Sequence, residues 1–71
     1  MSHLIDNLKS QLNSKHHFHL ISEDGATIQA HDLQGLYSLF VADNHGKTLF
    51  DGYSDLDRIF NHVKIHNRVE G

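Results

Sequence analysis

The sequence of 71 residues contains no cysteine and no proline, and only six basic residues. The lack of cysteine excludes disulfide bonds, thiolate metal sites and cysteine-based catalysis. The lack of proline means that no position is barred from the interior of a helix. Six basic against nine acidic residues leave no continuous positive surface of the kind that holds nucleic-acid phosphates. Stability must come from packing, and dimerisation is one way to enlarge a core this small.

Long apolar stretches are also missing. The longest uninterrupted apolar run, Leu39 to Ala42, is far shorter than a membrane span or the apolar part of a signal peptide. We therefore expect a soluble, cytoplasmic protein that makes no membrane contact. The length fits a single domain over residues 1–71.

The spacing of apolar residues predicts a helix at each end of the chain. Ser2 can cap a first helix over residues 3–13, whose apolar stripe is formed by Leu4, Ile5, Leu8 and Leu12. Ser54 opens a capping-box pattern that predicts a second helix to about residue 66. Its apolar face would be formed by Leu56, Ile59, Phe60 and Val63.

Turn residues divide the chain between the helices into four strands. We expect these strands over residues 16–23, 26–32, 36–43 and 47–53. Asp24-Gly25 predicts a two-residue turn in the first hairpin, and Asn44 to Gly46 predicts a three-residue loop in the third. The fold class is therefore α+β: a four-stranded antiparallel meander between two helices, in the order α-β-β-β-β-α, with both helices on one face of the sheet.

Strand side chains alternate between the two faces, so these turns assign each of them to one face. The face under the helices is expected to hold Ile21, Ile28, Ala30, Tyr37, Leu39, Val41, Leu49 and Tyr53. The opposite face is expected to expose Phe18, Leu20, Leu36, Phe40 and Phe50. Five large apolar side chains together on a surface normally mark an interaction site. Alternatively, a bulge that flips one strand, or one helix on each face, would place all of them in the core.

These observations favour a small protein-binding module that is not an enzyme. We expect it to bind another protein, and itself as a homodimer, through the five apolar residues of the outer face. Its role would be that of an adaptor, a regulator or an inhibitor, for example of a nuclease or a toxin. None of the glycine patterns that bind phosphates or dinucleotides occurs, nor the Gly-x-Ser-x-Gly pattern of serine hydrolases. We expect no cofactor.

Eight histidines raise a second possibility, the binding of a divalent transition metal. His62 and His66 are four residues apart on the second helix, so their rings can point in the same direction. A third ligand would have to come from another subunit or from His16, His17, His19 or His31. The alternative is that both are solvated residues near the carboxyl end of a helix, where a partly charged imidazole is favourable.

A third possibility is a surface that binds single-stranded nucleic acid. Phe18, Phe40 and Phe50 on the outer face could stack against bases. The excess of acidic over basic residues argues against this function, because phosphate contacts supply most of the affinity.

The histidine content predicts that the sign of the net charge changes in mild acid. The formal charge is -3 with all histidines neutral, and protonation of all eight would bring it to about +5 while most carboxylates stay ionised. Electrophoretic mobility should therefore reverse between about pH 7 and pH 5.5. A mobility that stays negative over this interval would contradict the prediction.

Overall fold

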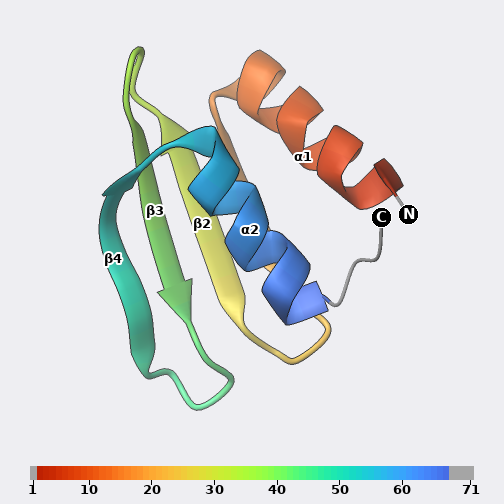
Figure 1. Cartoon of the computed structure of the whole chain (residues 1–71), viewed down its shortest axis with the longest axis vertical. Coiled ribbons are helices and arrows are strands. Elements are labelled where there is room, and N and C mark those ends of the chain that lie inside the picture. Colours follow the sequence, from red (N-terminus) through yellow and green to blue (C-terminus); the bar gives the residue numbers. More distant parts are fainter. Residues whose placement is uncertain (1, 68–71) are drawn as a thin grey trace.

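The structure, a computed structural model, describes residues 2–67. Its elements are α1 (Ser2–Lys15), β1 (His17–Ile21), β2 (Thr27–Asp32), β3 (Tyr37–Ala42), β4 (Thr48–Ser54) and α2 (Leu56–Asn67). The strands form one sheet in the order β1-β2-β3-β4, and each neighbouring pair is antiparallel. The predicted α+β meander between two helices is confirmed (Figure 1). Neither helix of this described part is long and apolar enough to cross a membrane.

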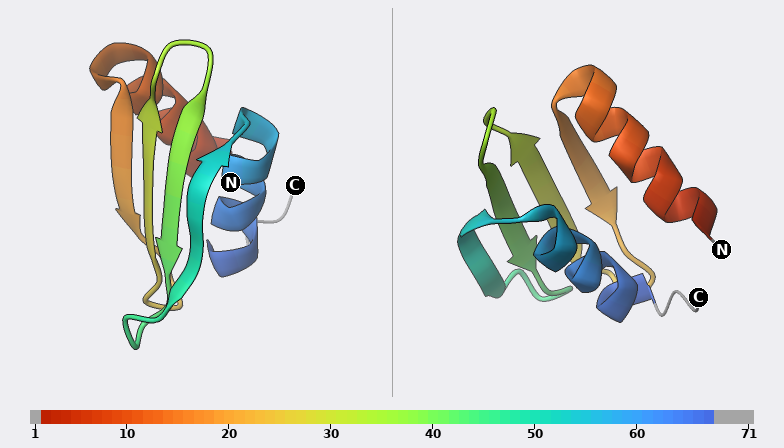
Figure 2. Two further views of the ribbon diagram at one scale, coloured as in Figure 1. Left: turned by 90° about the vertical axis from the view of Figure 1, so that its left-hand side faces the viewer. Right: turned by 45° about the horizontal axis from the view of Figure 1, so that its top comes forward.

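Both helices lie on the same side of the sheet, as predicted, so the fold has two layers (Figure 2). The core between the layers consists of Ile5, Leu8, Leu12, Phe18, Ile28, Ala30, Leu39, Val41, Ile59, Phe60 and Val63. Phe18 of β1 and Phe60 of α2 stack with their ring centroids 6.1 Å apart. Burying a large apolar side chain of this kind contributes roughly 1.5–3 kcal/mol. We call the side of the sheet turned toward the helices the covered face and the other side the open face.

The helix ends differ slightly from the predicted ones. α1 continues to Lys15 and stops at His16, whose φ of 66° is left-handed and cannot continue the helix. α2 is capped by Asp55 and not by Ser54: the Asp55 carboxylate accepts a hydrogen bond of 2.9 Å from the amide of Arg58. The predicted Ser54 cap is wrong because Ser54 still belongs to β4.

The first hairpin has a three-residue loop, not the predicted two-residue turn. Ser22 closes the loop by donating its amide to the Ala26 carbonyl (2.8 Å), and the amide of Gly25 bonds to the Ser22 carbonyl (3.0 Å). The amide of Ala26 in turn bonds to the Ser22 hydroxyl (3.1 Å) and to the Asp24 carboxylate (3.0 Å). These side-chain contacts stabilise the longer loop.

The longer loop moves β1 by one residue against β2. Phe18 pairs with Ala30 and Leu20 with Ile28, so both side chains lie on the covered face. Phe18 is buried in the core, and Leu20 packs against it. The prediction that Phe18 and Leu20 are exposed is wrong, and Ile21, expected on the covered face, is 60% exposed.

The third hairpin has the predicted three-residue loop, and it repeats the bonding of the first. Asp43 and Lys47 close it with a bond of 2.9 Å, and the Gly46 amide bonds to the Asp43 carbonyl (3.0 Å). The Asp43 carboxylate accepts hydrogen bonds from the amides of Lys47 (2.8 Å) and His45 (2.9 Å). These bonds, first that from Lys47, hold the pKa of Asp43 below its ordinary value.

A β-bulge in β4 changes the faces of its side chains. Ala42 pairs with Thr48 but Val41 pairs with Phe50, so Leu49 is the extra residue. Phe50 therefore points to the covered face, where it packs against the core. The predicted exposure of Phe50 is wrong, as is the predicted burial of Tyr53, which is 65% exposed.

The first and third loops lie against each other, with Gly25 of the first loop next to Asn44 of the third. Substitutions at the glycines of the two loops test this packing. Gly25 and Gly46 have nearly equal φ angles, 84° and 82°, but a Cβ on Gly25 would lie 2.8 Å from the Cβ of Asn44, whereas Gly46 has free space. Gly46→Ala should therefore cost about 1–2 kcal/mol from backbone strain alone. Gly25→Ala should cost about 1–3 kcal/mol more because of the clash. Urea unfolding measures both.

The same experiment in an Asn44→Gly background gives the control. Without the Asn44 Cβ, the costs of Gly25→Ala and Gly46→Ala should become similar. Equal costs in the wild-type background would show that the two loops do not pack as described.

Candidate interaction surface

The open face is the side of the sheet on which no described element packs (Figure 2). The register of the four strands arranges its side chains in three rows that run across the sheet. The first row is His17, His31, Ser38 and Tyr53; the second is His19, Gln29, Phe40 and Asp51; the third is Ile21, Thr27, Ala42 and Thr48.

Large apolar side chains occur at the centre and at the corners of this face. Phe40 lies half-buried in the middle row, next to Gln29 and Asp51. Tyr53 and Ile21 occupy opposite corners and are largely exposed. An antiparallel sheet with one solvated face usually carries polar side chains there. Phe40 is therefore only partly covered by its neighbours in the sheet, and Tyr53 and Ile21 are largely exposed, on a face that no described element covers.

Two leucines extend the open face past the end of the second hairpin. The amide of Leu33 bonds to the carbonyl of Leu36 (2.8 Å), so the pairing of β2 with β3 continues to these residues. Gln34 and Gly35 between them have φ angles of 60° and 105°, as in a type I′ turn. Alternation places both leucines beside the row that contains His31 and Ser38. They are 49% and 46% exposed.

The charged and titratable groups of the open face are unevenly distributed. His17 and His31 stack with ring centroids 5.7 Å apart, and His19 lies in the next row, so the imidazoles are on β1 and β2. Asp51, on β4, is the acidic residue of the three rows. No lysine or arginine is present in these rows.

The predicted binding residues are thus divided between the two faces. Leu36 is exposed and Phe40 lies on the open face, as predicted. Phe18, Leu20 and Phe50 lie on the covered face. Sequence reasoning missed Tyr53 and Ile21 on the open face, because both assignments depended on the register of an edge strand.

The same result removes the predicted aromatic platform for nucleic acid. Of Phe18, Phe40 and Phe50, only Phe40 lies on the open face. The face also lacks the basic side chains that would bind phosphates.

The histidine pair of α2 lies as predicted, but a different partner fixes one of its members. The rings of His62 and His66 stack with centroids 6.5 Å apart. His66 Nδ1 lies 2.6 Å from Asp24 Oδ2, and the ring of His62 packs 5.6 Å from that of Phe50. Within residues 2–67 no group of three or more histidine, cysteine or acidic side chains could hold a metal ion.

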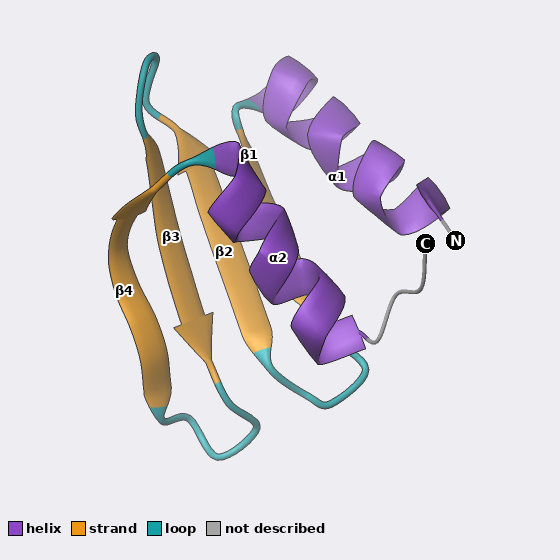
Figure 3. Ribbon diagram, viewed as in Figure 1, coloured by secondary structure: helices purple, strands orange, loops and turns teal. Residues whose placement is uncertain are grey.

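The loop between β1 and β2 lies beside the end of α2 (Figure 3). The contact of His66 with Asp24 is part of this junction between the first loop and α2. Asn67, buried at the end of α2, accepts a hydrogen bond of 3.0 Å from the amide of Glu23 and donates one of 2.9 Å to the Val63 carbonyl. Sequence reasoning missed Asn67, because a polar residue near a helix end gives no signal of burial. The junction is structural: it holds the loop that sets the register of β1.

The electrostatics of the junction are consistent with this structural role. Hydrogen bonds from the Ser22 hydroxyl, and next from His66, lower the pKa of Asp24 from 3.8 to about 2. Partial burial lowers the pKa of His62, and the nearby positive charges of His66 and Arg58 add to this effect. A neutral His62 suits its place beside the ring of Phe50.

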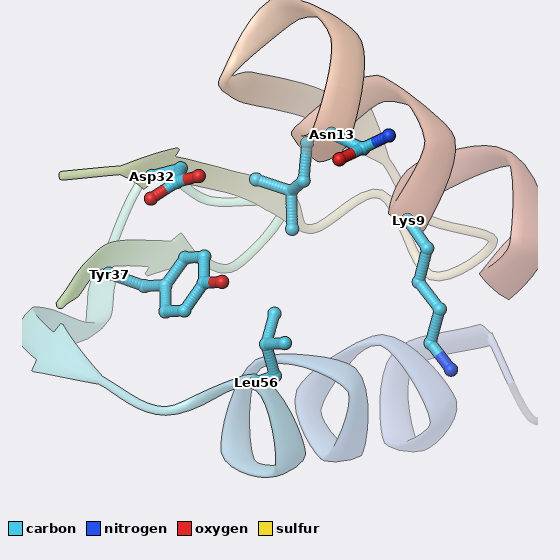
Figure 4. A pocket seen from close by; sticks show the side chains of 6 residues that line it. Lys9, Asn13, Asp32, Tyr37 and Leu56 are labelled. Atoms are coloured by element: carbon cyan, nitrogen blue, oxygen red, sulfur yellow. The ribbon is translucent and has the colours of Figure 1, made fainter. Parts of the chain in front are cut away.

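A small hollow lies where α1, α2 and the ends of β2 and β3 meet (Figure 4). Its volume is about 240 Å³, and it is lined by Lys9, Leu12, Asn13, Asp32, Tyr37 and Leu56. Ligand pockets usually measure about 300–1,000 Å³. The Asp32 carboxylate is already engaged by the amide of Gln34 at 2.8 Å. We assign no ligand to this hollow.

The junction predicts a particular pH dependence of stability. Because folding lowers the pKa of Asp24, its ionised form stabilises the protein fully above pH 3.8, and this contribution is lost as the pH falls toward about 2. Asp24→Asn should therefore lower the urea midpoint at pH 6, and the difference from wild type should shrink by pH 2.5. A difference that is constant over this range would contradict the role given to Asp24.

No protein-family model, curated protein sequence or solved structure matches this chain. The functional interpretation therefore depends on the chemistry of the open face.

Proposed function

We propose that this protein is a non-enzymatic protein-binding module that makes its contact through the open face of the sheet, with a second copy of the chain as its partner. A homodimer of this kind would serve as an adaptor, a regulator or an inhibitor. A cytoplasmic location remains a prediction from the sequence.

The observation that carries the proposal is the set of apolar side chains on a face that no described element covers. Phe40 at the centre and Tyr53, Leu33 and Leu36 around it gather within one side of the sheet. Aromatic side chains bury a large area at little entropic cost, and they are enriched in protein interfaces. A partner that covered this face would add a third layer to a small core.

The composition of the face also favours a protein partner over the other candidates. Asp51 is its formally charged side chain at neutral pH, so little charge would have to be desolvated on binding. Depletion of charge is typical of the centre of protein interfaces. The stacked imidazoles of His17 and His31 present flat rings that can pack against another aromatic side chain.

The test is the mass of the protein in solution, measured by sedimentation equilibrium over a range of concentrations. We expect wild type to dimerise and Phe40→Asp to raise the dissociation constant by at least about 30-fold, the effect of losing a central interface residue. Tyr53→Glu, at a largely exposed position, gives a second test that does not disturb half-buried packing.

Ile65→Asp provides the matched control. Ile65 is 62% exposed on α2, in the helical layer, so an acidic residue there should leave the mass unchanged. A wild type that stays monomeric at all concentrations, or a dimer that Phe40→Asp and Tyr53→Glu leave intact, would overturn the proposal.

A further inference from the structure

We infer that the second copy packs on the open face with the two-fold axis parallel to the strands, so that β1 of one copy lies over β4 of the other. The inference rests on the function proposed above and specifies how its partner is seated. It follows from the arrangement of charge and apolar side chains on the open face.

Two sheets that pack face to face with nearly aligned strands can be related by a two-fold axis in two ways. An axis parallel to the strands reverses the strand order, so β1 faces β4 of the partner and β2 faces β3. Each row of side chains then faces the same row of the partner. An axis perpendicular to the strands, in the plane of the sheet, keeps the strand order: β1 faces β1, β4 faces β4, and the first row faces the third.

Charge favours the axis parallel to the strands. In that arrangement His19 lies over Asp51 of the partner, because the two residues are at opposite ends of the middle row. The contact occurs twice in the dimer. With the perpendicular axis, the carboxylate of Asp51 faces that of the partner's Asp51, and His19 does not face an acidic residue. Like charges that face each other in an interface cost free energy and select against the wrong arrangement.

The apolar residues favour the same axis. Leu33 and Leu36 lie at one end of the face, past the first row. When each row faces itself, Leu33 of each copy lies over Leu36 of the other, and four leucines come together. With the perpendicular axis they would face the opposite end of the sheet, where the loops contain the exposed charged residues Glu23 and Lys47.

The central residue is compatible with both arrangements. Phe40 lies in the middle row on β3, next to the centre of the sheet. Either axis therefore brings the two Phe40 rings close to each other. Phe40 contributes to association with either axis. The leucines and the contact between His19 and Asp51 determine which of the two axes relates the copies.

The area of the open face sets the expected affinity of the dimer. Four strands about 4.8 Å apart, each contributing about six residues of about 3.4 Å, form a surface roughly 20 Å on a side. Two such faces would bury on the order of 1,000 Å² in total, at the lower end of specific interfaces. A dimer of micromolar affinity is expected.

Site-specific cross-linking distinguishes the two axes, and it is clean because the chain has no native cysteine. Stacked sheets lie about 10 Å apart, beyond the reach of a disulfide, so a short bismaleimide is the reagent. His19→Cys and Asp51→Cys are made separately and treated alone and as a mixture. In a mixed dimer the two cysteines replace one of the two contacts between His19 and Asp51. The other contact stays intact, because each variant still has the residue that the other lacks. Circular dichroism checks that both variants fold.

We expect the mixture to give several-fold more cross-linked dimer than either variant alone. Greater cross-linking of His19→Cys alone or of Asp51→Cys alone would overturn the inferred axis. So would a dimer that is detected by its mass and disrupted by Phe40→Asp but is not cross-linked in the mixture. In both cases the proposed function would stand, whereas a monomeric wild type would overturn both.

Discussion

The hydrogen bonds between Ser22 and Ala26 fix the register of β1, and most of the structure depends on that register. They close the first loop with three residues, and the amide of Ala26 is held by both the Ser22 hydroxyl and the Asp24 carboxylate. Because side chains alternate along a strand, a change of one residue would move the whole of β1 to the other face. Phe18 would then leave its place against Phe60, and the covered face would lose a large part of its core.

The bulge at Leu49 has the same effect at the other edge of the sheet. It turns Phe50 toward the core and leaves Tyr53 in solvent. Both edge strands thus place their phenylalanines under the helices. The apolar residues that remain outside are fewer, and they are Phe40 and side chains at the margins of the face. The two edges of the open face therefore differ: imidazoles lie toward β1, and a carboxylate lies on β4.

The sequence predicts the order of the elements, the meander and the single-sided helices, because apolar spacing and turn residues are local signals. It also predicts which side chains of β2 and β3 lie on each face of the sheet, because the connection between these two strands has the even number of residues that was expected. The faces of β1 and β4 could not be predicted in the same way, since each depends on one residue of loop or bulge. Ser22 carried a usable signal: it stands three residues before Gly25, as Asp43 stands three residues before Gly46.

The candidate surface was predicted in part. Phe40 and Leu36 belong to strands or turns whose register was correct, whereas Tyr53 and Ile21 could be assigned only from coordinates. The contact between Asp24 and His66 could not be foreseen, because it joins residues 42 positions apart. Their meeting depends on the direction in which α2 crosses the sheet, and helical periodicity does not determine that direction.

The meander also bears on how quickly the chain can fold. Each of the three strand pairings joins neighbours in the sequence through a short loop, so little chain entropy is lost before each hairpin forms. The hydrogen bonds of Glu23 and Asp24 with the end of α2, and the packing of Phe18 against Phe60, join residues that are far apart in the sequence. The strand pairings, in contrast, are local in the sequence, and local contacts speed the folding of small domains. With no prolyl bond to isomerise, this chain also has no slow phase of that origin.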